Sequence, residues 1–396
     1  MYKIVFAIPC HDLGGGRIAM PNGLARDLLT QVKYEPHLRV FAIRARSIEQ
    51  VYDPVEVNPA DHQGFSFAFL PWDGGRRSLP MALPAIRSML KAEAADSTVW
   101  HSNCSLGLFD LNTIGYAIGR RRAPGLRIFC LDSDPVSMLR GSGGLASAKA
   151  SLLRRSLIRR VEGADVTIVV GRGVEETYRR YARRCIATEA VWLMEGDLAE
   201  EGATRAKFAE SGPVRIALPS RLTAWKGVDD AIRAVALLGD RVGPFRLDIF
   251  GDGDQKEDLS ALVRSAGVGD RVRFLPSLPY GEPFFRALRE YHLVLVPTRG
   301  LEEARIVYDA AASGCLLVHS RTRTLEAALD PIPLRWSHEP GDVASLADSI
   351  AAAIGRRPEW AEGALAGIRA MQGRTIEEMH RKRSEFLKPL RADPTR

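Results

Sequence analysis

The chain has 396 residues, of which 46% are hydrophobic and 26% are charged, and 55 Lys and Arg against 48 Asp and Glu give a formal charge of +7. This length predicts two domains, and the sequence contains no run of about 20 apolar residues that would span a bilayer. The five cysteines are scattered and odd in number, so the sequence predicts a cytoplasmic protein without a disulfide framework or a zinc site.

The first half of the chain predicts strands that alternate with helices. The run KIVFAIP predicts a first strand at 3–9, a glycine-rich turn follows at 14–16, and a helical pattern runs from Leu24 to Leu29. Further strand candidates are LRVFAI, STVWHS, LRIFCL and ADVTIVVG, with helical segments between them. This alternation is typical of a parallel sheet.

The segment 149–160, KASLLRRSLIRR, alternates leucine pairs with arginine pairs at helical spacing. One interpretation is an ordinary surface helix with Leu153, Leu157 and Val161 turned to the core. The other is a basic amphipathic face that lies on anionic lipid, which would make the protein peripheral at the inner face of a membrane. Both stay open, whereas the small excess of cations does not predict a nucleic-acid partner.

The second half predicts another alternating domain. Residues 196–213 lack a strong apolar period and end in Gly-Pro, which indicates a linker between a domain at 1–195 and a domain at 214–374. Strands are expected at VRIALP, FRLDIFG, VRFLPS, HLVLVPT and CLLVHS. Asp342 is expected to cap a helix that Gly355 ends.

Two cations follow the strand VRIALP on a short loop. Arg221 and Lys226 precede a helix that Asp229 is expected to cap, and they would stand at the strand's carboxyl end. Ligands of open α/β sheets bind at that edge, and an arginine fork beside a lysine point charge suits the oxygens of a diphosphate. The alternative is two solvated surface cations.

Over most of residues 214–356 the chain resembles the retaining GT-B glycosyltransferases usually called family 4. The resemblance lies in RLTAWKG, IFGDGDQKEDL, VRFLPSLP, HLVLVPT and GLEEARIVYDAAASGCLLV. It implies two Rossmann-like doubly wound domains that face a cleft, with a C-terminal helix at 375–396 crossing back to the first. It also implies retaining transfer of a sugar from a nucleoside diphosphate sugar to a hydroxyl acceptor such as a glycan, a lipid-linked glycan or a small molecule. Neither a metal nor a cofactor is expected.

By this resemblance Arg221 and Lys226 would hold the diphosphate, and Asp309 would bind the ribose. The family's first carboxylate position falls here on Leu301. A shift of one residue would let Glu302 or Glu303 act as the catalytic carboxylate. In the alternative, both are exposed acids that favour the dipole of the following helix.

That helix is expected to begin near Glu303. The backbone N–H groups of Arg305, Ile306 and Val307 would then point at the pyrophosphate, because a helix N-terminus carries partial positive charge.

The first half resembles the family mainly in architecture. Gly14, Gly15 and Gly16 match its glycine loop, which approaches the donor. Where the family often carries His-Asp, this sequence has Leu131 and Asp132, so Asp132 is a catalytic candidate without the histidine.

His101 ends the strand STVWHS and is expected either to contact the acceptor or only to end that strand.

Other hypotheses remain open. Asp132, Ser133 and Asp134 are similar to the DxD motif that holds a divalent cation in the other glycosyltransferase fold, although a plain turn before Pro135 explains them as well. A nucleotide-sugar binding protein that has lost catalysis would explain Leu301. The sequence carries no zinc-hydrolase spacing, serine-hydrolase elbow or dinucleotide fingerprint, and it does not predict an oligomeric state.

Overall fold

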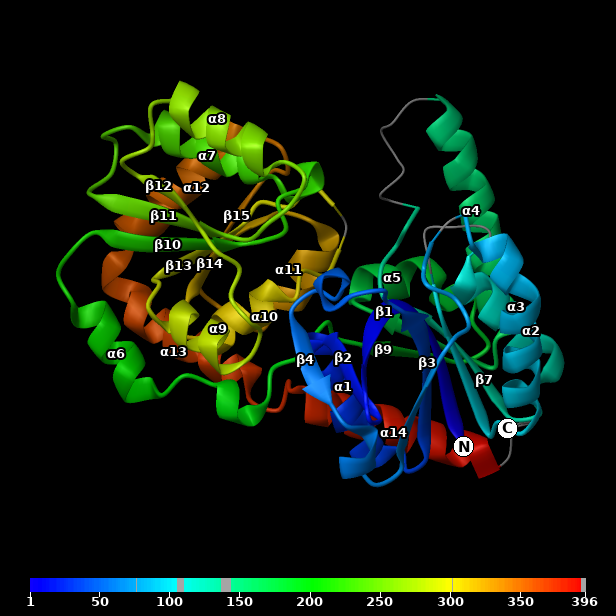
Figure 1. Cartoon of the computed structure of the whole chain (residues 1–396). Helices are drawn as coiled ribbons and strands as arrows, with labels where there is room; N and C mark the ends of the chain where they lie inside the picture. Colours follow the sequence, from blue (N-terminus) through cyan, green and yellow to red (C-terminus); the bar gives the residue numbers. More distant parts are fainter. Residues whose placement is uncertain (76, 105–109, 137–143, 301, 393–396) are drawn as a thin grey trace. The chain divides into compact units, whose positions relative to one another are not determined.

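The structure is a computed structural model that describes residues 1–75, 77–104, 110–136, 144–300 and 302–392 (Figure 1). The chain forms two compact units. Met1–Trp192 and Ile376–Arg396 make the first unit, and Leu193–Thr375 make the second. Within the described ranges, no helix is long and apolar enough to cross a bilayer.

The first unit is built on a sheet of nine strands. A parallel series runs in the order β5-β3-β1-β6-β7-β8-β9, while β2 pairs antiparallel with β1 and β4 pairs antiparallel with β2. Its strands are β1 Tyr2–Gly14, β2 Arg17–Pro21, β3 Leu38–Arg44, β4 Pro54–Val57, β5 Phe65–Phe69, β6 Val99–Asn103, β7 Leu126–Leu131, β8 Val166–Val170 and β9 Cys185–Thr188.

Helices cover both faces of this sheet. Side chains alternate along each strand, so Ile128 of β7 packs in the core under one helix layer and Phe129 in the core under the other. The first layer holds α1 and α14, joined by His380 Nε2 and Asp27 Oδ1 at 2.9 Å. The second holds α2, α3 and α4 (Figure 1). The bounds are α1 Asn22–Tyr34, α2 Leu79–Ala95, α3 Leu111–Arg122, α4 Gly144–Gly163, α5 Arg172–Tyr178 and α14 Ile376–Ala392.

The first strand is longer than the sequence predicts. We expected it to end at Pro9, but the register shift between Val5 and Pro9 accommodates the proline and β1 continues to Gly14. Gly14 then pairs with Arg17 across a tight turn. The three glycines therefore form the tip of a β-hairpin, and the helix begins only at Asn22.

The second unit is a six-stranded, fully parallel sheet. Its order is β12-β11-β10-β13-β14-β15. Strands β11 and β12 are added on one side of β10 and strands β13 to β15 on the other, so the strand order reverses between β10 and β13. The strands are β10 Val214–Pro219, β11 Phe245–Phe250, β12 Val272–Leu275, β13 Leu293–Val296, β14 Leu316–Ser320 and β15 Arg335–His338. The helices are α6 Glu201–Ala209, α7 Val228–Leu238, α8 Lys256–Ser265, α9 Glu282–Arg289, α10 Ile306–Ala312, α11 Arg323–Leu329, α12 Val343–Gly355 and α13 Trp360–Met371.

The segment that we expected to be a linker contains α6 and belongs to the second unit. The buried Lys207 of α6 donates to the carbonyl oxygens of Tyr291 at 2.9 Å and Gly314 at 2.7 Å. These contacts are polar and the segment has only a weak apolar period. For that reason the sequence did not predict the helix.

Candidate functional site

The reversal between β10 and β13 fixes where a ligand is expected on the second unit. In open α/β sheets, ligands bind outside the carboxyl ends of the strands at such a switch point. Two loops leave that edge here, one after β10 at 220–227 and one after β13 at 297–305. They carry the predicted Arg221, Lys226 and Glu302.

The two loops are fastened to each other through the backbone. The carbonyl oxygen of Trp225 accepts from the Arg299 N–H at 2.8 Å and from the Thr298 hydroxyl at 3.3 Å. Gly227 has φ +67°, and a Cβ there would lie 2.0 Å from the Pro297 carbonyl oxygen. Only glycine fits this approach, so the position of Lys226 relative to the second loop is fixed.

Arg299 adds a charged clamp between the loops. Its Nε donates to Asp230 Oδ2 at 2.9 Å, its Nη2 to Asp229 Oδ2 at 2.9 Å, and its Nη1 to the Ala224 carbonyl at 2.8 Å. The side chain of Asp230 is only 4% exposed. The expectation that Asp229 caps α7 is therefore wrong, because Gly227 is the N-cap residue and both aspartates bind Arg299 from the first turn.

At the switch point the Lys226 ammonium donates to Glu302 Oε1. Burial lowers the pKa of Lys226 below its usual value, and the opposite charge of Glu302 acts against that shift. The Trp225 ring lies under both predicted cations, 4.1 Å from Lys226 Nζ and 5.5 Å from the exposed Arg221 guanidinium. Lys226 thus has a partner, and Arg221 extends into solvent.

The Lys226 and Glu302 side chains line a hollow of only about 20 Å³ between the ends of β10 and β13. A pocket for a drug-sized molecule measures about 300 to 1,000 Å³. A diphosphate at this edge would therefore bind above the hollow or displace the Glu302 carboxylate from Lys226.

The structure separates the two adjacent glutamates. Glu303 accepts from the Tyr308 hydroxyl at 2.7 Å, whereas Glu302 lines the hollow. Both are partly buried and precede α10, which begins at Ile306, so the interpretation as exposed first-turn acids is wrong. Leu301 lies outside the described residues.

The late start of α10 also changes the expected backbone contacts. Arg305 is the N-cap residue and Ile306 lines the hollow, but the Val307 N–H already donates to the Ala304 carbonyl at 3.0 Å. The expectation that Val307 points at a pyrophosphate is therefore wrong.

Asp309 is buried and already engaged. Its Oδ1 accepts from the Tyr280 hydroxyl at 2.9 Å, and its Oδ2 lies 3.7 Å from Arg305 Nε. The Arg305 guanidinium also lies 5.0 Å from the centre of the Tyr280 ring. A ribose hydroxyl at this carboxylate would share Asp309 with the Tyr280 hydroxyl and the Arg305 guanidinium, or displace one of them.

On the first unit, the predicted glycines lie at the hairpin tip and are exposed. Gly14, Gly15 and Gly16 have φ values of +81°, +61° and +83°, and a Cβ on any of them would meet nothing within 4 Å. The turn conformation, rather than crowding, therefore requires glycine here.

Asp132 is exposed just beyond β7 and accepts from the Cys104 thiol at 3.0 Å and the Ser133 hydroxyl at 3.2 Å. Asp134 accepts instead from the Tyr178 hydroxyl at 2.9 Å and the Val136 N–H at 3.2 Å. In the described part of the chain, no three His, Cys, Asp or Glu side chains gather as metal ligands would. The geometry lends no support to a DxD metal site.

His101 is 3% exposed within β6, and its Nδ1 shares a hydrogen bond of 2.9 Å with the Tyr2 hydroxyl. Burial lowers the pKa of His101 to about 3, so the ring is neutral at physiological pH. The geometry gives no support to the acceptor contact predicted for His101, because the side chain points into the core.

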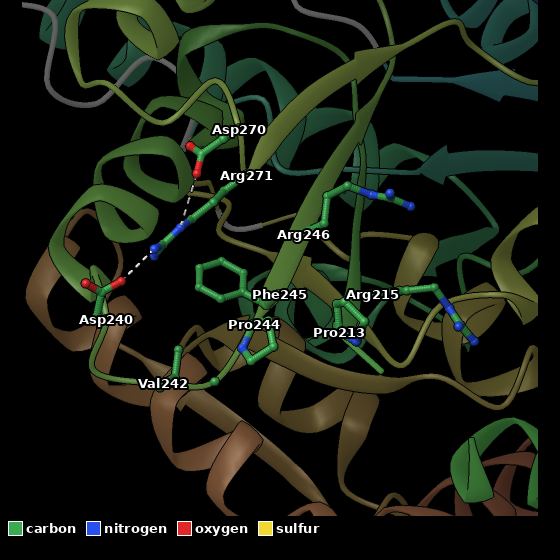
Figure 2. A pocket seen from close by; sticks show the side chains of 10 residues that line it. Pro213, Arg215, Asp240, Val242, Pro244, Phe245, Arg246, Asp270 and Arg271 are labelled. Atoms are coloured by element: carbon green, nitrogen blue, oxygen red, sulfur yellow. Dashed lines mark hydrogen bonds and ion pairs between the residues drawn. The ribbon is translucent and has the colours of Figure 1, made fainter. Parts of the chain in front are cut away.

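A larger hollow of about 650 Å³ lies at the amino ends of β10 and β11, opposite the predicted edge (Figure 2). Arg271 reaches Asp240 at 2.8 Å and Asp270 at 3.8 Å in this hollow, and Arg246 lies 3.3 Å from Asp248. This hollow lies away from the carboxyl ends of the strands, where ligands of open α/β sheets bind, so we do not place a diphosphate here.

Arg299, Trp225 and Tyr280 are site residues that the sequence did not reveal. The available signal was the pair Asp229 and Asp230 at the start of α7, since two adjacent carboxylates near a buried edge need a cation.

Residues 213–356 match the family model described as glycosyl transferases group 1. Among curated proteins, a 2-deoxystreptamine glucosyltransferase of Streptomyces kanamyceticus is 30% identical over 141 residues, which are 36% of each chain. An exopolysaccharide phosphotransferase of Streptomyces coelicolor is 35% identical over 148 residues, 35% of this chain and 15% of the relative. The chain thus spans about a third or less of the length of these relatives.

Solved structures match over nearly the whole chain. A sucrose-phosphate synthase from Thermosynechococcus elongatus has a TM-score of 0.75 at 18% identity and covers 99% of both chains. Anabaena HepE, solved in complex with UDP and glucose, has a TM-score of 0.68 at 16% identity and covers 98% of this chain and 100% of its own. The predicted GT-B fold is confirmed, with its C-terminal helix α14 packed on the first unit.

Proposed function

We propose that this chain, a GT-B protein whose residues 213–356 match the group 1 glycosyl transferases, transfers a sugar from a nucleoside diphosphate sugar to a hydroxyl acceptor. We propose further that it retains the anomeric configuration and needs neither a metal nor a cofactor.

One observation carries the proposal. Lys226 and Glu302 meet at the switch point of the second sheet, on two loops that Gly227 and Arg299 hold together. A cation and a carboxylate fixed at that edge can serve a leaving diphosphate and the adjoining sugar. The match of residues 213–356 to a transferase family agrees with this use of the edge.

Lys226 and Arg221 would act on the leaving group. In the reaction, the bond between the anomeric carbon and the diphosphate oxygen breaks, and negative charge grows on the diphosphate. Cations that are already fixed stabilise such charge without reorganising, and one such donor contributes about 3 to 4 kcal/mol. Arg221 is exposed and would reach an outer phosphate oxygen, whereas Lys226 is held in place.

Glu302 is the better of the two candidate glutamates. When the diphosphate takes Lys226, the Glu302 carboxylate loses its cation and lies beside the sugar, where it would stabilise positive charge at the anomeric carbon. The acceptor oxygen then bonds to that carbon, and its proton passes to a carboxylate or to the departing phosphate. Glu303, bound by Tyr308, would support the loop instead.

The donor to test first is UDP-glucose. Anabaena HepE, whose fold this chain shares, is also solved with UDP-glucose, and the curated relative from Streptomyces kanamyceticus is a glucosyltransferase. Release of UDP from UDP-glucose, with and without added sugar acceptors, measures both hydrolysis and transfer.

Lys226→Ala tests the assignment. Loss of one preorganised donor of this kind costs about 10² to 10³ in turnover, so we expect a decrease of at least a hundredfold. Lys382→Ala on α14 is the control, because it removes an exposed lysine of the first unit. A Lys226→Ala variant that releases UDP at nearly the rate of the parent protein would refute the role of Lys226.

A nucleotide-sugar binding protein without catalysis is the second candidate. It is favoured by Leu301, which stands in the sequence where the family has its first carboxylate. The binding protein would gain thermal stability from UDP-glucose but release no UDP. Activity that survives a chelator would support the metal-independent proposal, and activity lost on chelation and restored by a divalent cation would contradict it.

A further inference from the structure

The outer surface of the helix layer α2, α3 and α4 on the first unit is strongly basic. Eight exposed cations stand there against two exposed carboxylates, Asp96 and Glu162, among the described residues. We call these cations the basic face: Arg87, Lys91, Arg120, Arg121, Arg122, Lys149, Arg155 and Arg159.

The helices of this surface are neighbours in one layer (Figure 1). The Tyr116 hydroxyl of α3 donates to the Arg160 carbonyl of α4 at 2.8 Å, and Arg160 Nη2 donates to the Thr113 hydroxyl at 2.9 Å. The inner side of α4 is apolar, since Leu153, Leu157 and Val161 are fully buried. The surface-helix interpretation of this segment is therefore confirmed for its inner side, and the cations lie on the other.

These cations have no ion-pair partner within the part of the chain that the structure describes. In contrast, two of the exposed cations of α14 are paired: Arg381 lies with Glu378 at 2.7 Å, and Lys382 lies with the same glutamate at 3.4 Å. Cations at a helix C-terminus are commonly explained by the helix dipole. That explanation covers the end of α3 but not Arg155 in the middle of α4.

Apolar side chains stand among the cations. Leu152 is 55% exposed and lies one turn from both Lys149 and Arg155, and Met81 on α2 is 81% exposed. A helix surface that combines cations with exposed apolar side chains suits the boundary between lipid headgroups and acyl chains. Binding to a nucleic-acid backbone would need the cations but not the leucine.

We propose that the basic face docks the protein on a bilayer that contains anionic lipid, with Leu152 and Met81 entering the headgroup layer. This inference does not rest on the proposed function, because it concerns a surface of the first unit that includes no residue assigned to donor binding or catalysis.

Vesicle co-sedimentation of the full chain tests the charge contribution. We expect binding to vesicles of 30% phosphatidylglycerol in phosphatidylcholine, none to pure phosphatidylcholine, and a loss of binding as salt rises. A basic residue near an anionic surface contributes about fivefold in partitioning. The triple variant Lys149→Gln, Arg155→Gln, Arg159→Gln should therefore bind roughly a hundredfold more weakly.

The matched control removes three exposed cations from α14 as Arg381→Gln, Lys382→Gln, Lys388→Gln, and should bind within a few-fold of the parent. Thermal unfolding of both triple variants verifies that they fold. If the two triple variants lose binding equally, net charge rather than the basic face is responsible, and the proposal is wrong.

Leu152→Ala separates lipid from a polyanion. It should weaken vesicle binding at least several-fold, because the change removes three carbon groups and each one that is buried in the membrane contributes about 0.8 kcal/mol, or roughly fourfold. Binding of a DNA duplex should not change with Leu152→Ala. The proposal fails if Leu152→Ala binds vesicles as the parent does, or if a DNA duplex binds more tightly than the anionic vesicles.

Discussion

Replacing Arg299 by alanine tests whether the clamp between the two loops is an energetic unit. The change removes a charged partner from Asp230, which is almost fully buried, and from the partly exposed Asp229. Breaking a buried ion pair by removing one partner costs about 3 to 5 kcal/mol. Arg299 is itself 33% exposed, and Arg233 Nη1 lies 3.9 Å from Asp230, so we expect a value near the lower end, about 3 kcal/mol.

A double-mutant cycle shows where that cost arises. Asp230→Asn keeps the shape of the side chain and removes its charge, so it should cost less than Arg299→Ala. In the double variant, no buried charge is left without a partner. We therefore expect the double variant to be more stable than the sum of the two single changes predicts, by at least about 1 kcal/mol.

The assay is urea unfolding of the full chain, combined with hydrogen exchange of the amides at 224–231. Arg299→Ala should lower protection in that segment more than elsewhere, and Arg299→Lys should restore part of it. Residues that do not interact have additive effects on the free energy of unfolding. The clamp is therefore refuted if the effects of Arg299→Ala and Asp230→Asn add within about 0.5 kcal/mol in the double variant.

Two further outcomes are expected. Gly227→Ala should destabilise the loop and weaken donor binding, because its Cβ would lie 2.0 Å from the Pro297 carbonyl at a φ of +67°, while Gly243→Ala, which meets nothing within 4 Å, should leave the melting temperature nearly unchanged. Burial lowers the pKa of His101 to about 3 and of His292 and His319 to about 4, so these rings stay neutral when folded but gain a proton below about pH 6.5 when unfolded. Their stabilisation is complete above that pH and declines toward pH 4, so the free energy of unfolding should fall between pH 7.5 and 5 by up to about 2 kcal/mol per histidine. The urea midpoint should fall with it, and an unchanged midpoint would contradict this.

Much of the fold could be predicted because its signals are local. The apolar stripe of α7 is buried as expected at Ile232, Val235 and Leu238. The Asp342 side chain accepts from the Ser345 N–H at 3.0 Å and caps α12, which ends at Gly355. Each of these features depends on residues within one or two turns of each other.

The arrangement of the candidate site could be predicted only in part. Arg221 and Lys226 were recognisable because strand, loop and helix follow one another in the sequence. The contacts of Arg299 with Asp230 and of Tyr280 with Asp309 join segments that are far apart in the sequence. No local sequence pattern predicts such contacts. The same limit explains why the start of α10 was misplaced, since the residues before Ile306 are fixed by Lys226 and Tyr308 rather than by helical hydrogen bonds.

The return of α14 to the first unit has a consequence for how the protein is made. Leu387 belongs to the apolar core of that unit, and His380 contacts Asp27 of α1. During synthesis, at about 5 to 20 residues per second, the whole second unit emerges before α14 does. The first unit is thus completed only after the second has emerged, and its apolar surface stays uncovered by α14 until that helix leaves the ribosome.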